Sequence, residues 1–133
     1  MSIEDYKKLL ARQNRGKSAA SEHDLQKQCI DWFRMIYPQY ARLLLAIPNG
    51  ARRTLWEQRI AKEEGIQAGT PDLFLAIPRK KSHGLWIEMK NGKAGRVSDK
   101  QDDMIKRLWE QGYECRIARS MEDFMQIINE YLA

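Results

Sequence analysis

Two carboxylates that could bind a metal ion and a lysine that could contact a phosphate stand at the ends of two neighbouring predicted strands. Asp72 opens one apolar run, and Glu88 and Lys90 close the next run along the chain. The connection between the runs, PRKKSHG, is short, so the strands are expected to pair as an antiparallel hairpin that brings Asp72 level with Glu88 and Lys90. Side chains alternate along a strand, so Glu88 and Lys90 share a face while Met89 points away. Two carboxylates and an ammonium group are therefore predicted on one surface.

This combination of charges favours a bound cation. Like charges close together raise the pKa of one carboxyl group and weaken the sheet, and a cation removes that cost. Oxygen donors without a thiolate or an imidazole pair are typical of a hard ion, Mg²⁺ or Mn²⁺, and the backbone carbonyl of Met89 is a further candidate ligand. Such an ion activates water and neutralises charge that builds up on a phosphate. Lys90 could orient that water, lower its pKa or contact the phosphate oxygen.

The same charges also have a simpler interpretation. A glutamate and a lysine at an exposed strand end are ordinary surface residues. However, Leu85, Trp86 and Ile87 precede them and predict a buried strand. Charge that enters the end of a buried strand usually has a function, so the context favours the metal site.

The elements that position these residues can be predicted from caps and apolar spacing. Four segments open with Ser or Thr followed three residues later by an acid or an amide, a pattern typical of helix N-caps. One of these segments predicts an amphipathic helix from Leu55 to Gly65, which could form a dimer surface or pack against the sheet. The four caps are Ser21, Thr54, Ser98 and Ser120. Short apolar runs bounded by Pro or Gly predict strands that begin at Leu43, Asp72, Gly84 and Tyr113.

The order of these elements predicts an α/β (α+β) fold with one mixed four-stranded sheet flanked by helices. With 133 residues, the chain fits one domain. The pattern of residues 1–20 predicts a basic N-terminal arm or a loose helix. For this arm, a solvated tail is a simpler interpretation than a DNA contact. Residues 21–133 are then the functional domain.

Composition narrows the class of partner and the compartment. Lys and Arg number 23 against 18 Asp and Glu, and the pI near 9.3 points weakly towards an anionic partner such as nucleic acid. Cys29 and Cys115 have no paired spacing, so we expect buried, reduced thiols. No apolar run is long enough to cross a bilayer, and the polar start MSIEDYKK lacks the apolar core of a signal peptide. We therefore expect no membrane contact and a cytoplasmic location.

Two short motifs resemble those of a known enzyme family. The run G-T-P-D-L at Gly69 to Leu73, followed by I-E-M-K at Ile87 to Lys90, resembles the PD-(D/E)XK nuclease superfamily. It is more closely similar to the virus-type replication-repair nuclease branch, the VRR-NUC domain. That branch combines a glutamate on the first helix, G-x-P-D, E-x-K and a glutamine that opens the next helix. The matching residues here are Glu22, Gly69 to Asp72, Glu88 to Lys90, and Gln101, and the resemblance runs from about Ser21 to the C-terminus.

The resemblance implies a restriction-endonuclease-like core and assigns roles to the matching residues. The implied catalytic set is Asp72, Glu88, Lys90, Glu22 and Gln101. The implied ligands of Mg²⁺ or Mn²⁺ are Asp72, Glu88 and the Met89 carbonyl, with Glu22 supporting the metal or its waters. Simpler interpretations exist for two members: the helix dipole favours any acid at Glu22, and Gln101 completes a capping box with Ser98.

The implied substrate is DNA. Phosphate contacts are expected from basic residues near the proposed site, namely Arg52, Arg53, Lys93, Arg96 and Lys100. The cations Arg79 to Lys81 lie in the hairpin loop at the opposite sheet end, where a solubility role is the better interpretation. No base-reading motif is evident, which favours recognition of DNA shape.

The resemblance further implies a structure-selective endonuclease of DNA repair or of a phage that resolves Holliday (four-way) junctions as a homodimer. Paired cuts in such a junction require two active sites. Two alternatives remain open: a non-catalytic DNA-binding module on a nuclease fold, and a sequence-specific restriction-type endonuclease.

Overall fold

A computed structural model describes residues 3–13, 21–48 and 54–133. Helices and strands alternate in the predicted order, and the expectation of one mixed four-stranded sheet flanked by helices is confirmed. In chain order the elements are α1 (Ile3–Gln13), α2 (Glu22–Ile36), the 3-10 helix η1 (Pro38–Leu43), β1 (Leu44–Ala46), α3 (Leu55–Glu63), β2 (Leu73–Leu75), β3 (Leu85–Met89), α4 (Asp99–Glu110), β4 (Glu114–Ala118) and α5 (Met121–Leu132).

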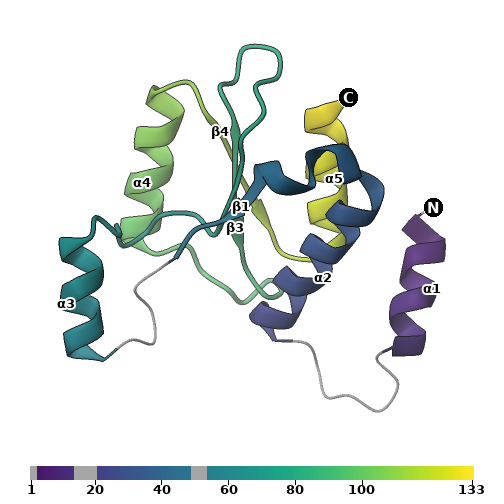
Figure 1. Ribbon diagram of the computed structural model, residues 1–133, viewed down its shortest axis with the longest axis horizontal. Coiled ribbons are helices and arrows are strands. Elements are labelled where there is room, and N and C mark those ends of the chain that lie inside the picture. The colour runs from purple at the N-terminus through teal and green to yellow at the C-terminus, as the bar shows by residue number, and fades with distance from the viewer. Residues whose placement is uncertain (1–2, 14–20, 49–53) are drawn as a thin grey trace.

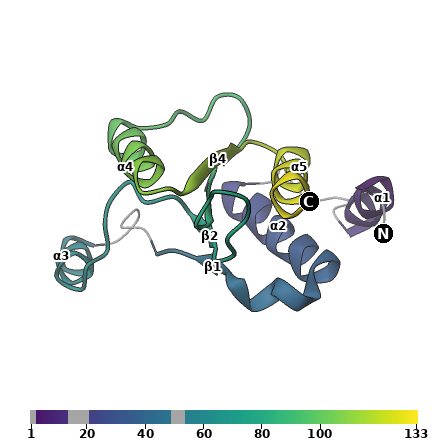
Figure 2. The same ribbon diagram turned by 90° about the horizontal axis from the view of Figure 1, so that it is seen from above.

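The sheet has the order β1-β2-β3-β4. The β1–β2 and β2–β3 pairs are antiparallel, whereas β3 and β4 run parallel, connected through α4. Helices α2 and α5 cover one face of the sheet and α4 covers the other (Figure 1), and α1 lies outside α2 and α5 (Figure 2). Strand β3 is therefore central and covered on both faces.

The two faces of β3 carry different kinds of side chain. Leu85, Ile87 and Met89 are completely buried among the core residues of α2 and α5. On the other face Trp86 stacks on Phe74 of β2, with ring centroids 4.4 Å apart. Burial of apolar side chains is the main stabilising term for such a sheet. It also fixes the register, because a slip by one residue would turn the whole apolar set outwards.

All four predicted N-caps are confirmed. The side-chain oxygen of each cap residue accepts a hydrogen bond from the backbone N–H three residues later. Ser21 and Ser98 form complete capping boxes, in which the third residue of the helix also accepts from the cap N–H. The third residue of the helix in the box at Ser98 is Gln101, one of the candidate site residues.

Helix α3 differs from the expectation in two ways. It ends at Glu63, and Gly65 follows with φ +95°, a conformation that stops a helix and that glycine tolerates best. The helix also stands away from the sheet (Figure 1), with Leu55 85% and Trp56 66% exposed while Ala61 is buried. The interpretation that this helix packs its apolar face on the sheet was therefore wrong.

Other parts of the chain follow the sequence more closely. Cys29 and Cys115 are free and buried, as predicted. In α1, the side chain of Tyr6 is buried and its hydroxyl donates to the backbone oxygen of Gln28, 3.0 Å away, which ties this helix to α2. None of the helices in the described part of the chain is long and apolar enough to span a membrane.

Candidate active site

The β2–β3 hairpin brings the two predicted carboxylates together. Leu73 pairs with Ile87, so the same register continued by one residue sets Asp72 opposite Glu88 on one face of the sheet. The Asp72 Oδ2 atom accepts a hydrogen bond of 2.7 Å from the backbone N–H of Met89. This bond ties the residue before β2 to the end of β3 and fixes the position of the Asp72 carboxylate.

Glu88 is the one buried charged side chain among the described residues, with 3% of its surface exposed. Its Oε1 atom accepts a 3.0 Å hydrogen bond from Gln101 Nε2 and lies 3.5 Å from Lys90 Nζ. Burial is the first cause that raises the pKa of Glu88, to about 8, and the neighbouring Asp72 carboxylate is the second, while Lys90 opposes both. The carboxyl group therefore sits where its charged form needs a further cation.

A divalent ion fits this donor set. Within the described residues, Glu88 Oε2 is buried and receives no hydrogen bond, which is costly for a carboxylate oxygen. A hard cation held between Asp72 and Glu88 would remove both this cost and the repulsion between the two groups. Mg²⁺ suits a site with one or two carboxylates because it keeps several waters in its coordination shell.

Glu22 does not form one acidic cluster with Asp72 and Glu88. It is exposed in the first turn of α2, and the described residues contain no group of three acidic, histidine or cysteine side chains that could hold a metal. Direct coordination would need the side chain beside Asp72 and Glu88. A role for Glu22 through water stays a prediction.

Gln101 connects the lysine, the buried carboxylate and the start of α4. Its Oε1 atom accepts from Lys90 Nζ at 3.0 Å and from the Ser98 backbone N–H at 2.9 Å, while its Nε2 donates to Glu88. One side chain thus caps α4 and also contacts both Glu88 and Lys90. Because both of its polar ends are bonded, Gln101 holds the Lys90 ammonium, which is 12% exposed, beside Glu88.

Gly69 sets the distance between Asp72 and α4. Its φ is +84°, and a Cβ atom built on it would lie 2.5 Å from the backbone oxygen of Lys100 and 2.6 Å from the carbonyl carbon of the same residue. Only glycine allows the segment before Asp72 to lie so close to the first turn of α4. The glycine of the G-x-P-D motif therefore has a packing role that brings Gln101 towards the carboxylates.

Sequence reasoning assigned no function to Arg119, which follows β4. Its guanidinium Nη1 donates to the backbone oxygens of Gly92 and Gly95 in the segment between β3 and α4. Gly95 lies directly on the Lys90 side chain, since a Cβ there would be 3.1 Å from Lys90 Cβ. Arg119 therefore holds this segment over the lysine stem. Its position after a predicted strand is the only hint in the sequence, and it becomes informative once β4 is known to lie parallel to β3.

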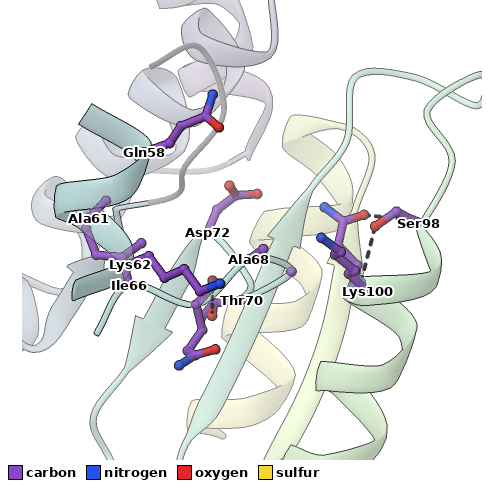
Figure 3. A pocket seen from close by; sticks show the side chains of 12 residues that line it. Gln58, Ala61, Lys62, Ile66, Ala68, Thr70, Asp72, Ser98 and Lys100 are labelled. Carbon is purple, nitrogen blue, oxygen red and sulfur yellow. Dashed lines mark hydrogen bonds between the residues drawn. The ribbon is translucent and has the colours of Figure 1, made fainter. Parts of the chain in front are cut away.

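A cleft of about 560 Å³ opens beside Asp72. Figure 3 shows the Asp72 side chain directed into the space between α3 and the start of α4. The cleft has three walls: the last turns of α3, the segment that leads into β2, and the first turn of α4. The lining residues are Gln58, Ala61, Lys62, Ile66, Gln67, Ala68, Gly69, Thr70, Asp72, Ser98, Lys100 and Gln101.

The residues expected to contact DNA are distributed unevenly. Lys100 is exposed and lines the cleft, and Lys93 and Arg96 are exposed in the segment between β3 and α4. Arg52 and Arg53 lie outside the described residues. At the opposite end of the hairpin, Arg79 Nη2 donates to the hydroxyl of Tyr40 at 3.2 Å, so this cation has a structural contact.

Comparison with known proteins gives the same family and fold as the motifs. The model of the VRR-NUC domain matches residues 6–122. A solved structure titled "VRR_NUC domain protein" is similar to this chain with a TM-score of 0.76 and 24% sequence identity, over 86% of this chain and 90% of that one. At that identity the structure speaks for the fold alone, and it confirms the predicted fold class. Curated proteins gave no match.

Proposed function

Because the chain belongs to the VRR-NUC nuclease family, we propose that it is a Mg²⁺- or Mn²⁺-dependent endonuclease that hydrolyses phosphodiester bonds in branched DNA. The family assignment confirms the resemblance drawn from the motifs and indicates DNA as the partner. The observation that carries the proposal is the pair formed by Asp72 and Glu88 beside Lys90, with one Glu88 oxygen buried and without a donor.

In this proposal Asp72 and Glu88 hold the ion, and the backbone carbonyl of Met89 and a water supported by Glu22 complete the protein's share of ligands. The ion, when bound, would lower the pKa of a bound water and neutralise charge on the phosphate. The Lys90 ammonium, held by Gln101 at 3.0 Å and lying 3.5 Å from Glu88, would orient the attacking water, lower its pKa or contact the phosphate oxygen. Gln101 is a positioning residue that acts through Lys90 and Glu88.

The proposed substrate is a four-way junction, cut by a homodimer. Two symmetric cuts need two active sites, and a two-fold dimer supplies them. Leu55 and Trp56 of α3 are exposed and do not line the cleft, so this part of the helix is the candidate dimer surface. Lys93, Arg96 and Lys100 beside the site, together with Arg52 and Arg53, would contact backbone phosphates without reading bases.

Cleavage assays with linear, flap and four-way DNA of one sequence test the proposal. Mg²⁺ or Mn²⁺ should support cutting of the branched substrates, and EDTA should abolish it. Asp72→Asn and Lys90→Ala should retain DNA binding and lose cleavage by about 100-fold or more. The matched control, Lys106→Ala, removes an exposed cation of α4 that pairs with Asp102 and should cut normally.

The same assays separate the alternatives. Cleavage that persists in EDTA would refute the metal site. Binding without any cleavage would indicate a non-catalytic module, and cutting of linear duplex at one defined sequence would indicate a restriction-type enzyme. Sedimentation of the protein with and without a junction tests the dimer, and a monomer in both states would rule it out.

A further inference from the structure

The cleft beside Asp72 has no role in the chemistry described above. It is shared between the active site, which contributes Asp72 and Gln101, and residues outside it on α3, such as Gln58 and Lys62. We infer that this cleft binds a nucleotide of an unpaired DNA strand next to the phosphate that is cut. The inference rests on the proposed function and adds the state of the substrate: strands that are separated beside the cut.

The size of the cleft supports a single strand. Pockets of roughly 300 to 1,000 Å³ enclose ligands of drug size, a class to which a nucleotide belongs, and this cleft of about 560 Å³ falls within that range. A base pair with its two backbones is larger than a single nucleotide, so the cleft suits one strand better than a duplex. The contact between Gly69 and Lys100 closes one side of the cleft with backbone atoms. The cleft cannot widen there unless the segment before Asp72 separates from α4.

The walls offer the chemistry that a nucleotide requires. Lys62 on α3 and Lys100 on α4 supply cations from two walls, and such cations are the usual partners of DNA phosphates. Ile66 and Ala68 supply apolar surface for a sugar or a base. This set recognises a nucleotide without selecting its sequence.

This arrangement gives a physical reason for selectivity towards branched DNA. A base must leave its stack before it can enter a pocket, and this costs least where the base is already unpaired. Flaps present such nucleotides, and the centre of a four-way junction interrupts the stacking of its base pairs, whereas a linear duplex offers neither feature. The cleft would therefore discriminate between DNA structures before the chemical step.

Binding of a fluorescent base analogue tests the inference separately from cleavage. The Lys90→Ala protein, in EDTA, is mixed with splayed DNA that carries 2-aminopurine in an unpaired nucleotide at the branch, or with linear duplex that carries it in a base pair. We expect the fluorescence of the unpaired probe to change on binding and that of the paired probe to stay constant. If both probes respond alike, or neither does, the inference is wrong.

Variants of the cleft assign the effect to its residues. In the same background, Lys62→Ala and Ala68→Trp should each weaken binding of splayed DNA about tenfold and change duplex binding less than twofold. Lys106→Ala, a lysine of α4 that does not line the cleft, should change neither. Circular dichroism confirms that each variant is folded. Equal losses on both kinds of DNA, or no loss from either cleft variant, would overturn the inference. These binding tests require no cleavage. The inference can therefore hold even if the metal-dependent chemistry fails, and that chemistry can hold even if the inference fails.

Discussion

The two ends of the β2–β3 hairpin both carry charged residues, yet only one end forms a site. At the loop end, Lys80 and Lys81 are exposed, and the hairpin projects away from the helices (Figure 1). At the other end, Glu88 is buried and bonded to Gln101, with Lys90 close by. Lysines of the same chemistry are therefore solvated at one end and held in a fixed position at the other.

The difference arises from what covers each end. Helix α4 begins at the site end, and the segment from Asn91 to Val97 passes over Lys90 on its way to it. Cover removes water, which strengthens each electrostatic contact and makes an unpaired charge costly. The surrounding backbone therefore holds the charged groups of the candidate site in place, and the changes below alter that cover or those charges.

Gly69→Ala should have the largest effect because it separates α4 from the carboxylates. A Cβ at this position would lie 2.5 Å from the Lys100 backbone oxygen, so α4 and Gln101 must move. A displacement of about 1 Å at an active site costs roughly 100-fold in rate. We expect cleavage of branched DNA to fall by about that factor, measured as kcat/KM, and the melting temperature to fall as well.

Gly65→Ala is the matched control for this prediction. Gly65 also has a positive φ, +95°, but a Cβ there would meet nothing within 4 Å. It therefore carries the same kind of backbone strain, about 1 to 2 kcal/mol, without the clash. If Gly65→Ala reduced cleavage as much as Gly69→Ala, strain rather than the contact with α4 would explain the loss.

The raised pKa of Glu88 predicts a pH-dependent stability of the metal-free protein. The folded carboxyl group keeps its proton up to about pH 8, whereas in the unfolded chain it loses the proton near its ordinary value of about 4.3. The contribution of this group to stability is thus complete below pH 4.3 and is lost as the pH rises through 8. At about 1.4 kcal/mol per unit of pKa, the expected loss is a few kcal/mol.

Urea unfolding in EDTA between pH 5 and pH 9 measures this loss. The stability of Glu88→Gln relative to wild type should increase steadily as the pH rises. When Mg²⁺ replaces EDTA, it should stabilise only the wild type at high pH. Glu110→Gln, an exposed change at the end of α4, serves as the control. Parallel curves for wild type and Glu88→Gln would show that the Glu88 pKa is not raised in solution.

Local patterns predicted the parts of this comparison that depend on neighbours in sequence. The caps at Ser21, Thr54, Ser98 and Ser120 follow from a three-residue spacing, and the antiparallel hairpin follows from its short loop. Because the hairpin register follows from the loop, the approach of Asp72 to Glu88 was also predictable. Apolar spacing, which is also a local pattern, predicted that β3 lies in the core.

The parts that the sequence did not predict depend on contacts between distant segments. Two such contacts join residues more than twenty positions apart: the one between Gly69 and Lys100, and the one between Arg119 and Gly95. Neither contact has a periodic pattern in the sequence, since each depends on how α4 and the segment before it pack against distant parts of the chain. The position of α3 was predicted wrongly for a related reason. Apolar spacing identifies a helix but does not show which surface its apolar face will contact.

Arg119→Ala should have an intermediate effect on cleavage. Loss of its hydrogen bonds to Gly92 and Gly95 would loosen the segment over Lys90 without changing a group that touches substrate. Residues that orient an active-site group typically contribute 10- to 100-fold, and we expect about tenfold in kcat with little change in KM. Arg119→Lys, which keeps the charge but cannot make the same paired contact, should be nearly as slow. Faster reductive methylation of Lys90 in both variants, read by mass spectrometry, would show that the cover has opened.

The loop end of the hairpin provides the smallest expected effect. Lys80→Ala and Lys81→Ala together remove two exposed cations. These residues lie at the opposite end of the sheet from Asp72. Their only effect on a phosphate bound at the site should be long-range electrostatic attraction, which salt screens within about 10 Å. We expect cleavage and DNA affinity within twofold of wild type, and stability within about 0.5 kcal/mol. A large loss of affinity confined to four-way DNA would mean that one arm of the junction reaches this loop, and the two ends would then act on the same substrate.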